Sequence, residues 1–279
     1  MTTTLVILAA LGLLVGGGLW KLRHLSSKKK KKLIKKGVAS FYQRLEDRGL
    51  VARTPGFVKN YHRHYPALET LEKNHHVIRE ECLALLQRKD DLTDMKHMGG
   101  NYTQAGIHTI QWKTFMFKSG DFIEENCALA PETAKLLRDV PDMYTAFFSV
   151  IDPNQYVTPH WGYYKGFVRY HLGVIIPGDN ADRTCWLRVN DDRDDNLAKD
   201  KALVANGTRY YWHEGEGVVF DDTYLHDAAN ESDEVRVVLW LDMLKPHPWY
   251  LQLINRLFLW IAHRDKSVEK IRHNALVAP

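Results

Sequence analysis

Two histidines and an arginine have the types and spacing needed for a metal-dependent oxidation. His160 and His226 are 66 residues apart, and Arg236 follows the second histidine by ten. An oxygen-activating iron site needs neutral imidazoles from separate strands and open coordination positions. A co-substrate that carries a carboxylate also needs a cation to hold it. This constellation favours an enzyme over a binding module.

Short strand-like segments surround these residues and would have to position them. Runs of β-branched and aromatic residues at 145–151, 168–176, 218–220 and 235–243 are separated by turns rich in Pro, Gly and Asp. We also expect a strand within His108–Gly120 and a short helix within Cys127–Pro141, with Pro131 at its start. Many short strands without βαβ alternation predict a sandwich or jelly roll, in which adjacent antiparallel strands can bring distant residues together.

Composition and charge limit the classes of function. The chain has 279 residues, enough for one catalytic domain of about 200 residues with additional elements. Its three cysteines are too few and too scattered for a disulfide framework, which fits a reducing compartment. Nine of its 38 basic residues lie between Lys21 and Lys36, leaving 29 basic and 34 acidic residues elsewhere, a net charge of −5. A mildly acidic body argues against nucleic acid as a partner.

The N-terminal segment predicts a membrane anchor. Thr2 to Trp20 carries no charge, and as a helix it would cross about 30 Å of hydrocarbon. Because the positive charges follow this segment, the positive-inside rule predicts a single-pass protein whose catalytic domain is cytoplasmic. A cleaved signal peptide, or a solvated lysine linker after the apolar segment, is the alternative.

Four regions follow from these patterns. We expect a transmembrane anchor at 1–22, a basic juxtamembrane segment with a helical region at 23–98, a jelly-roll domain at 99–245 and an amphipathic helical tail at 246–279. The apolar part of the tail is too short to span a bilayer, so it either lies among lipid headgroups or packs against the N-terminal helices. The charged insertion Arg188–Lys201 is expected to be a solvated surface loop.

Several motifs resemble one known family. They are WKTF, ENCALAPETAKLL, H-x8-RYHLG and G-x4-FDD-x3-H-x9-R, and they extend over roughly Trp112 to Asp242. This region resembles the aspartyl/asparaginyl β-hydroxylase family of Fe(II)- and 2-oxoglutarate-dependent oxygenases, and within it the membrane-attached lipid A hydroxylases. The resemblance implies a mainly β fold: a double-stranded β-helix, or jelly roll, with flanking helices.

The resemblance also implies roles for individual residues. His160 and His226 would bind iron, and O2 would react there. No protein side chain would be needed as a general acid or base. The co-substrate 2-oxoglutarate would be held at its distal carboxylate by Ser149 and Arg236, and its other end would face Arg169 and His171.

Gly162 leaves the third metal ligand undetermined. Many oxygenases of this type have a carboxylate two residues after the first histidine, and this chain has glycine there. Water could complete the site, chloride could do so in a halogenase, and Asp222 is a possible protein substitute.

The substrate is the least determined feature. The apolar N-terminal segment, the lysine run and the apolar tail favour a lipid acyl chain presented at a membrane. A peptide hydroxylated on Asp or Asn is the main alternative. A halogenase and an inactive membrane-bound binding module are less favoured.

Overall fold

The computed structural model describes residue 37 and residues 40–97, 110–162, 164–264 and 266–277. The chain divides into two compact units, residues 1–52 and residues 53–279. The described part of the first unit contains a helix over 40–47. The second unit contains every described strand and the candidate site. The predicted boundaries of the jelly-roll domain, 99 and 245, remain a prediction.

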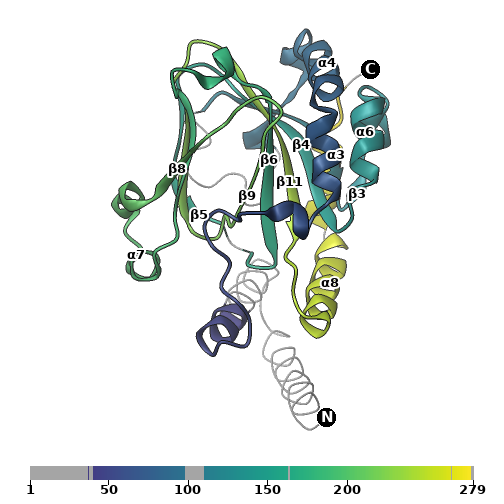
Figure 1. The fold of residues 1–279 in the computed structure, drawn as a ribbon. Coiled ribbons are helices and arrows are strands. Elements are labelled where there is room, and N and C mark those ends of the chain that lie inside the picture. Colours follow the sequence, from purple (N-terminus) through teal and green to yellow (C-terminus); the bar gives the residue numbers. More distant parts are fainter. Residues whose placement is uncertain (1–36, 38–39, 98–109, 163, 265, 278–279) are drawn as a thin grey trace. The chain divides into compact units, whose positions relative to one another are not determined.

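Two antiparallel sheets form the body of the second unit (Figure 1). Among the described residues, the larger sheet has seven strands and the smaller has four. The larger sheet contains, in spatial order, β1 (Thr93–Asp94), β2 (Trp112–Ser119), β4 (Met143–Ile151), β11 (Arg236–Leu244), β6 (Phe167–Ile175) and β9 (Gly217–Phe220), and β3 (Asp121–Phe122) pairs with β2. The smaller sheet contains β5 (Gln155–Trp161), β10 (Leu225–Asn230), β7 (Cys185–Asn190) and β8 (Thr208–Tyr211).

The strand order is that of a jelly roll. Among the eight strands from β4 to β11, the larger sheet contains β4, β11, β6 and β9 as neighbours, in that order. The smaller sheet contains β5, β10, β7 and β8 as neighbours, in that order. Strands that alternate between two facing sheets in this way make the two Greek keys of a jelly roll. The prediction of a mainly β fold is confirmed.

Helices cover one face of the larger sheet (Figure 1). These are α3 (Ala67–Lys73), α4 (His75–Leu86) and α6 (Pro131–Arg138), and α6 begins at the predicted proline. Because side chains alternate along a strand, one face of the sheet carries a continuous apolar layer. That layer joins helix residues in one buried cluster, whose members include Leu68, Leu71, Ile78, Leu137, Phe115, Phe117, Phe148, Leu239 and Leu241. Burying each such side chain contributes about 1.5–3 kcal/mol, so this face provides much of the stability.

The opposite face of the larger sheet looks toward the smaller sheet and carries the polar residues of the candidate site. Arg169 and His171 on β6 are in register with Asp242 and Trp240 on β11. In the same way, Ser149 on β4 lies opposite Val238 on β11. Successive residues of the same strands therefore point alternately into the apolar core and into the candidate site.

The remaining helices lie in connections and at the C-terminus. The α-helices are α5 (Glu124–Cys127), α7 (Arg193–Ala198), α8 (Trp249–His263) and α9 (Lys266–Asn274). The 3-10 helices are η1 (Tyr61–Arg63), η2 (Lys89–Asp91), η3 (Met95–His97), η5 (Pro177–Asn180) and η6 (Lys201–Asn206). The insertion that was expected to be a loop contains α7, because the Asp192 side chain accepts a hydrogen bond from the Asp195 amide (2.9 Å) and caps the helix.

The prediction of a single-pass membrane protein with a cytoplasmic catalytic domain is contradicted by the structure. No helix in the described part of the chain is long and apolar enough to cross a bilayer. The longest helix described, α8, has 15 residues, whereas a span needs about 20. The apolar segment Thr2–Trp20 and the lysines that follow it lie outside the described residues.

Candidate active site

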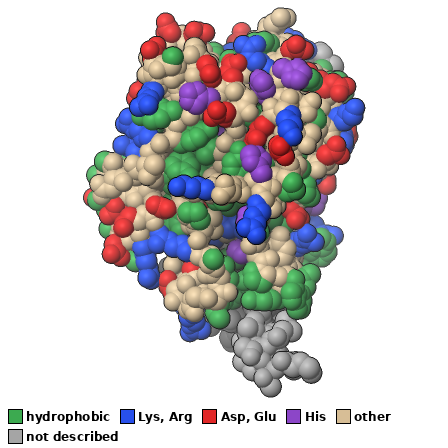
Figure 2. Space-filling model, viewed as in Figure 1, with side chains coloured by type: hydrophobic (Ala, Val, Ile, Leu, Met, Phe, Trp, Pro, Cys, Tyr) green, Lys and Arg blue, Asp and Glu red, His purple; other side chains and the backbone are tan. Residues whose placement is uncertain are grey.

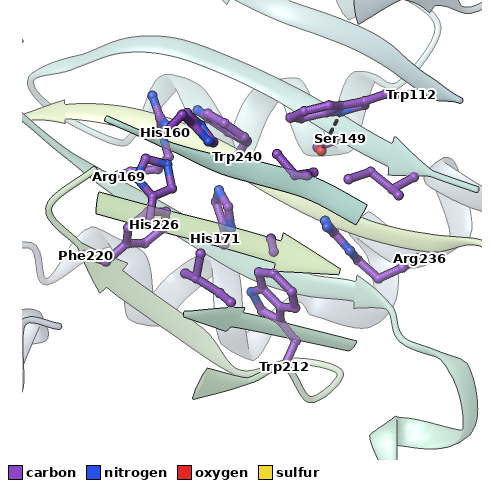
Figure 3. Close-up of a pocket in the computed structure, with 14 residues that line it drawn as sticks. Trp112, Ser149, His160, Arg169, His171, Trp212, Phe220, His226, Arg236 and Trp240 are labelled. Atoms are coloured by element: carbon purple, nitrogen blue, oxygen red, sulfur yellow. Dashed lines mark hydrogen bonds between the residues drawn. The ribbon is translucent and has the colours of Figure 1, made fainter. Parts of the chain in front are cut away.

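His160 and His226 face each other across two neighbouring strands. The register of β5 and β10 pairs the two residues directly, and their ring centroids are 4.1 Å apart. Directly after His226 the register shifts by one residue, because Thr158 and Pro159 of β5 lie opposite the single residue Asp227 of β10. Figure 3 shows both rings at one end of a pocket. Two strands that are distant in sequence thus bring two imidazoles together.

Both histidines have the same tautomer, fixed by the backbone. The Nδ1 atom of His160 lies 2.8 Å from the carbonyl oxygen of Thr158, and that of His226 lies 2.8 Å from the carbonyl oxygen of Tyr224. Because a carbonyl oxygen can only accept, each Nδ1 carries the proton and each Nε2 keeps its lone pair. Burial lowers the pKa of His160 to about 4 and the pKa of His226 well below its ordinary value. Both imidazoles are therefore neutral near pH 7, the form that binds a metal.

Arg236 is a buried cation in the same pocket. It begins β11, is 2% exposed and lies with its guanidinium 4.5 Å from the centroid of the Trp212 ring. Its Nε has no hydrogen-bond partner among the described residues. Burial lowers the pKa of Arg236 to about 10, so the group stays charged at neutral pH. A buried guanidinium without a carboxylate beside it is costly, and an anionic ligand would offset that cost.

Ser149 lies on the same sheet face as Arg236. The register of β4 and β11 places Arg236 opposite Ile151, two residues along β4 from Ser149. The buried Ser149 hydroxyl oxygen accepts a hydrogen bond from Trp112 Nε1 at 3.0 Å. The hydroxyl proton can then be donated to another acceptor, such as a carboxylate held by the arginine.

Arg169 is fixed by two carboxylates. Its Nη2 lies 3.0 Å from Asp222 Oδ2, and its Nε donates to Asp242 Oδ1 at 3.0 Å. The guanidinium also stacks 3.9 Å from the centroid of the Trp240 ring. Its charge is largely compensated within the protein, in contrast to that of Arg236, and its orientation is set by three groups.

His171 is enclosed by aromatic rings. Its ring centroid is 4.7 Å from that of Trp240, 5.0 Å from that of Phe220 and 5.8 Å from that of Trp212. Neither ring nitrogen has a hydrogen-bond partner among the described residues. Burial, with smaller contributions from two arginines, lowers the pKa of His171 well below its ordinary value. A buried neutral imidazole of this kind can donate one hydrogen bond to a bound ligand.

Gly162 occupies the position at which many oxygenases have a third metal ligand, and it lies against Asp222. The Gly162 amide donates to the carbonyl oxygen of Asp222 at 2.7 Å. A Cβ atom at position 162 would lie 2.3 Å from Asp222 Oδ2, so a side chain does not fit there. Burial raises the pKa of Asp222 to about 6, although Arg169 opposes that shift. In the described part of the chain, no three His, Cys, Asp or Glu side chains form a metal-binding group.

All six residues singled out from the sequence line one pocket, whose empty space, together with the open solvent at its mouth, is about 360 Å³ (Figure 3). They are Ser149, His160, Arg169, His171, His226 and Arg236. Sequence reasoning missed the remaining lining residues: Trp112, Trp212, Trp240, Phe220, Ile151, Val157, Leu187 and Ala228. Strand alternation could have found some of them, because Trp240 is four residues from Arg236 on the same strand and so faces the same way.

The charged insertion contributes to the site from outside the pocket. Asn196 on α7 accepts two hydrogen bonds at its Oδ1, from Trp161 Nε1 (2.9 Å) and from the Leu225 amide (2.9 Å). These two donors are the immediate neighbours of His160 and His226 in the sequence. The Lys199 ammonium lies 4.8 Å from the centroid of the Trp161 ring. The insertion therefore fastens the ends of both histidine-bearing strands to each other.

Comparison with known proteins identifies related sequences. Residues 72–246 match the family described as aspartyl/asparaginyl beta-hydroxylase. An ornithine lipid ester-linked acyl 2-hydroxylase of Rhizobium tropici is 31% identical over 183 residues, which cover 65% of this chain and 58% of the relative. The human aspartyl/asparaginyl beta-hydroxylase is 26% identical over 185 residues, covering 64% of this chain and 21% of the relative.

The chain thus spans less than two thirds of the length of these relatives. Among solved structures, an oxidoreductase of the 2OG-Fe(II) oxygenase family from Burkholderia pseudomallei has 10% identity and a TM-score of 0.36, covering 50% of this chain and 69% of the other. Similarity at this level is too low to indicate a shared function.

Proposed function

Because the chain belongs to the aspartyl/asparaginyl β-hydroxylase family, we propose that it is an Fe(II)- and 2-oxoglutarate-dependent dioxygenase that hydroxylates an aliphatic carbon of a lipid acyl chain. The family predicted from the sequence motifs is confirmed, and the expectation of a hydroxylase is confirmed at the level of the family. The observation that carries the rest of the proposal is Arg236, a buried cation that no carboxylate of the described residues pairs with, in the same pocket as two neutral imidazoles.

Arg236 and Ser149 fit the distal carboxylate of 2-oxoglutarate. A guanidinium presents a planar pair of donors that matches a carboxylate, and a bound carboxylate would supply the anion that no described side chain offers to Arg236. The Ser149 hydroxyl, oriented by Trp112, adds a third donor. Figure 3 shows Arg236 and Ser149 toward one end of the pocket and the two imidazoles toward the other, as expected for a ligand that bridges a cation and a metal.

His160 and His226 fit a divalent iron ion. Both present an unprotonated Nε2, and both are held by a backbone hydrogen bond at Nδ1, an arrangement that orients metal-binding histidines. With only two protein ligands, positions would remain open for 2-oxoglutarate, O2 or water. When bound, iron and 2-oxoglutarate supply the oxidising chemistry, in which 2-oxoglutarate becomes succinate and carbon dioxide and one oxygen atom enters a C–H bond of the substrate.

The chain's other residues orient the reactants and exclude water. Trp212, Trp240 and Phe220 surround His171 and form an apolar wall around the polar groups. Arg169, held by two carboxylates, is fixed at the metal-binding end of the pocket (Figure 3). No general acid or base is required of the protein in this reaction.

Halide transfer is a weaker candidate than hydroxylation. A halogenase needs space and favourable charge for chloride beside the metal. The side chain adjoining Gly162 is the Asp222 carboxylate, and Arg169, which would otherwise attract an anion there, is already bound to it. A buried carboxylate repels chloride, so Asp222 favours water at this position.

A lipid acyl chain is the proposed substrate class. Support comes from the acyl 2-hydroxylase of Rhizobium tropici at 31% identity, and from the apolar residues that complete the pocket lining, among them Val157, Leu187 and Ala228. A peptide hydroxylated on Asp or Asn is the second candidate, supported by the human relative at 26% identity. Retention of Arg236 and both histidines in one pocket argues against an inactive binding module.

A direct test is to supply the iron-loaded protein with 2-oxoglutarate, O2 and either a mixture of acyl lipids or a peptide library. We expect succinate together with a lipid product heavier by one oxygen atom, and neither in the His226→Ala variant. Oxygen gain in peptides alone would replace the lipid substrate with a peptide. Succinate production that survives in His226→Ala would overturn the iron assignment.

A further inference from the structure

Helix α8 carries an apolar stripe that faces solvent. Trp249, Leu253, Leu257 and Trp260 are 67%, 58%, 55% and 55% exposed. Their spacing of four, four and three residues places all four on one side of the helix. In Figure 2, hydrophobic side chains gather on the surface over α8, at the lower right of the view. Soluble monomers seldom leave so many large apolar side chains in one continuous row, and such rows mark binding surfaces.

The opposite side of α8 is fixed to the catalytic unit. Leu251 and Asn255 are buried on that side. Asn255 Nδ2 donates to the Gly166 carbonyl oxygen at 2.9 Å, and its Oδ1 accepts from the Tyr164 hydroxyl. A Cβ atom at position 166 would lie 2.3 Å from Asn255 Oδ1, so glycine is required for this close approach. The stripe is therefore held in one orientation relative to the connection that contains Gly166.

That connection joins two strands of the candidate site. It begins after His160 and Trp161 on β5 and ends at β6, which carries Arg169. In Figure 3, His160 and Arg169 lie toward the end of the pocket opposite Arg236. If 2-oxoglutarate occupies the Arg236 end, the substrate must reach the end near this connection. Helix α8 is thus attached, through Asn255, to the segment that leads to the substrate end of the pocket.

The charge of α8 fits an anionic surface. The helix contains no Asp or Glu; Arg256 lies within it and Arg264 directly follows its last residue. The Arg264 guanidinium lies 3.4 Å from the centroid of the Trp260 ring, and Arg256 pairs with Asp142 at 2.9 Å. Tryptophans at both ends of a leucine row, with cations at its margins, are typical of helices that lie in the interface of an anionic bilayer.

We propose that α8 binds the protein to an anionic lipid surface, with Trp249, Leu253, Leu257 and Trp260 inserted among the headgroups and acyl chains. The inference rests on the proposed lipid substrate, because such binding would place the substrate end of the pocket beside the acyl chain to be oxidised. At 15 residues, or about 22 Å, α8 lies along the surface and does not cross it. Attachment of this kind is peripheral and needs no spanning helix.

Fluorescence at a single labelled position tests this binding in the full-length chain. The native cysteines Cys82, Cys127 and Cys185 are buried, so an introduced surface cysteine can be labelled selectively. An environment-sensitive fluorophore is attached at Leu253→Cys and, as a control, at Leu83→Cys, a partly exposed leucine on α4. The probe is a vesicle of phosphatidylcholine and phosphatidylglycerol, with lipids brominated on the acyl chain as quenchers.

Vesicles should shift the emission of the label at position 253 to the blue and quench it, and leave the label at position 83 unchanged. Equal behaviour of the two labels would overturn the proposal. So would a label at position 253 that is already shielded before vesicles are added, which would show that another segment of this chain covers the stripe. A vesicle-independent shift that grows with protein concentration would show instead that a second copy covers it.

A second variant separates this inference from the proposed function. Leu253→Glu/Leu257→Glu should reduce hydroxylation of lipid in anionic vesicles at least about ten-fold, because two side chains lose their apolar burial. Turnover of the same lipid dispersed in detergent should stay unchanged, as should both activities of the control Leu83→Glu. Equal turnover of vesicle lipid by wild type and double variant would overturn the role of α8. Absence of lipid turnover by the wild type in both forms would overturn the substrate assignment alone.

Discussion

His160 and His226 occupy directly opposed positions on β5 and β10, and each donates its Nδ1 proton to the carbonyl oxygen two residues earlier in its own chain segment. The same local arrangement therefore occurs on both sides of the pair. It fixes both tautomers through backbone carbonyls and leaves an unprotonated Nε2 on each of two rings whose centroids are 4.1 Å apart. A metal ion that prefers imidazole nitrogen is the simplest ligand for that pair.

Replacing one histidine of the pair should remove the metal. We expect His226→Ala to lose stoichiometric iron binding and all succinate production, while its circular dichroism remains that of a folded β protein. His213→Ala is a matched control, because His213 is partly exposed and bonds the Asp179 carbonyl oxygen outside the pocket. Full iron content in the His226 variant, measured by metal analysis, would refute the pair as the ligands.

Arg236→Met should separate ligand binding from stability. The variant should weaken 2-oxoglutarate binding by about two orders of magnitude, the loss expected for a charged bidentate contact. In the absence of 2-oxoglutarate, the free energy of unfolding should stay constant or rise by about 1–4 kcal/mol, because a buried uncompensated cation is removed. Titration calorimetry and chemical denaturation measure the two effects, with exposed Arg209→Met as the control. A marked loss of stability without a loss of affinity would assign Arg236 a structural role.

Gly162→Ala should destabilise the fold at the candidate metal site. Its Cβ would lie 2.3 Å from Asp222 Oδ2 and 2.7 Å from the Asp222 carbonyl oxygen, so backbone as well as side chain must move. Overpacking of this kind costs about 1–3 kcal/mol. For the same reason, Gly162→Asp should not create a third ligand or raise iron affinity. Gly37→Ala, where nothing lies within 4 Å of the added Cβ, is the control. Tighter iron binding by Gly162→Asp would contradict this, because it would show that Asp222 moves aside and the new carboxylate binds the metal.

Trp112→Phe should reveal the orientation of Ser149. The substitution keeps an aromatic ring in the pocket wall but removes the donor that binds the serine hydroxyl at 3.0 Å. Loss of one neutral hydrogen bond should weaken 2-oxoglutarate binding about 2- to 10-fold. In Trp186→Phe, the lost indole nitrogen has no hydrogen-bond partner among the described residues, so affinity should not change. Equal 2-oxoglutarate dissociation constants for wild type and Trp112→Phe would exclude this role.

His247 should make stability depend on pH. Burial, with a smaller contribution from Lys245, lowers the pKa of His247 from 6.5 to about 4. The unfolded chain therefore binds a proton between these values that the folded chain does not, so stability falls as pH decreases from about 6.5 to about 4. The slope for one imidazole is at most about 1.4 kcal/mol per pH unit. His247→Gln should flatten the pH dependence of the free energy of urea unfolding over that interval, and parallel curves for wild type and variant would contradict the assignment.

Local sequence patterns were sufficient to predict the helices and strands whose formation depends on neighbouring residues. The strand Trp112–Ser119 and the helix that begins at Pro131 lie inside their predicted ranges, because β-branched runs and an N-terminal proline act over a few residues. The spacing of the residues singled out His160, His226 and Arg236, and the family resemblance added Ser149, Arg169 and His171. All six side chains line one pocket. The expectation of a solvated loop at Arg188–Lys201 missed the hydrogen bonds of Asn196 with Trp161 and Leu225. The composition of a segment does not indicate which residues, distant in sequence, it contacts.

By itself, the sequence determined the family, the mainly β class and the residue types that could bind iron and a dicarboxylate. Only the tertiary structure decided that His160 meets His226 in register, that Asp222 fills the space beside Gly162, and that Arg236 is buried with no carboxylate of the described residues paired to it. The physical reason is that alternation along each strand is local, whereas the pairing of strands depends on how two sheets pack over a shared core. Charge compensation and close approach arise only once those distant strands are side by side.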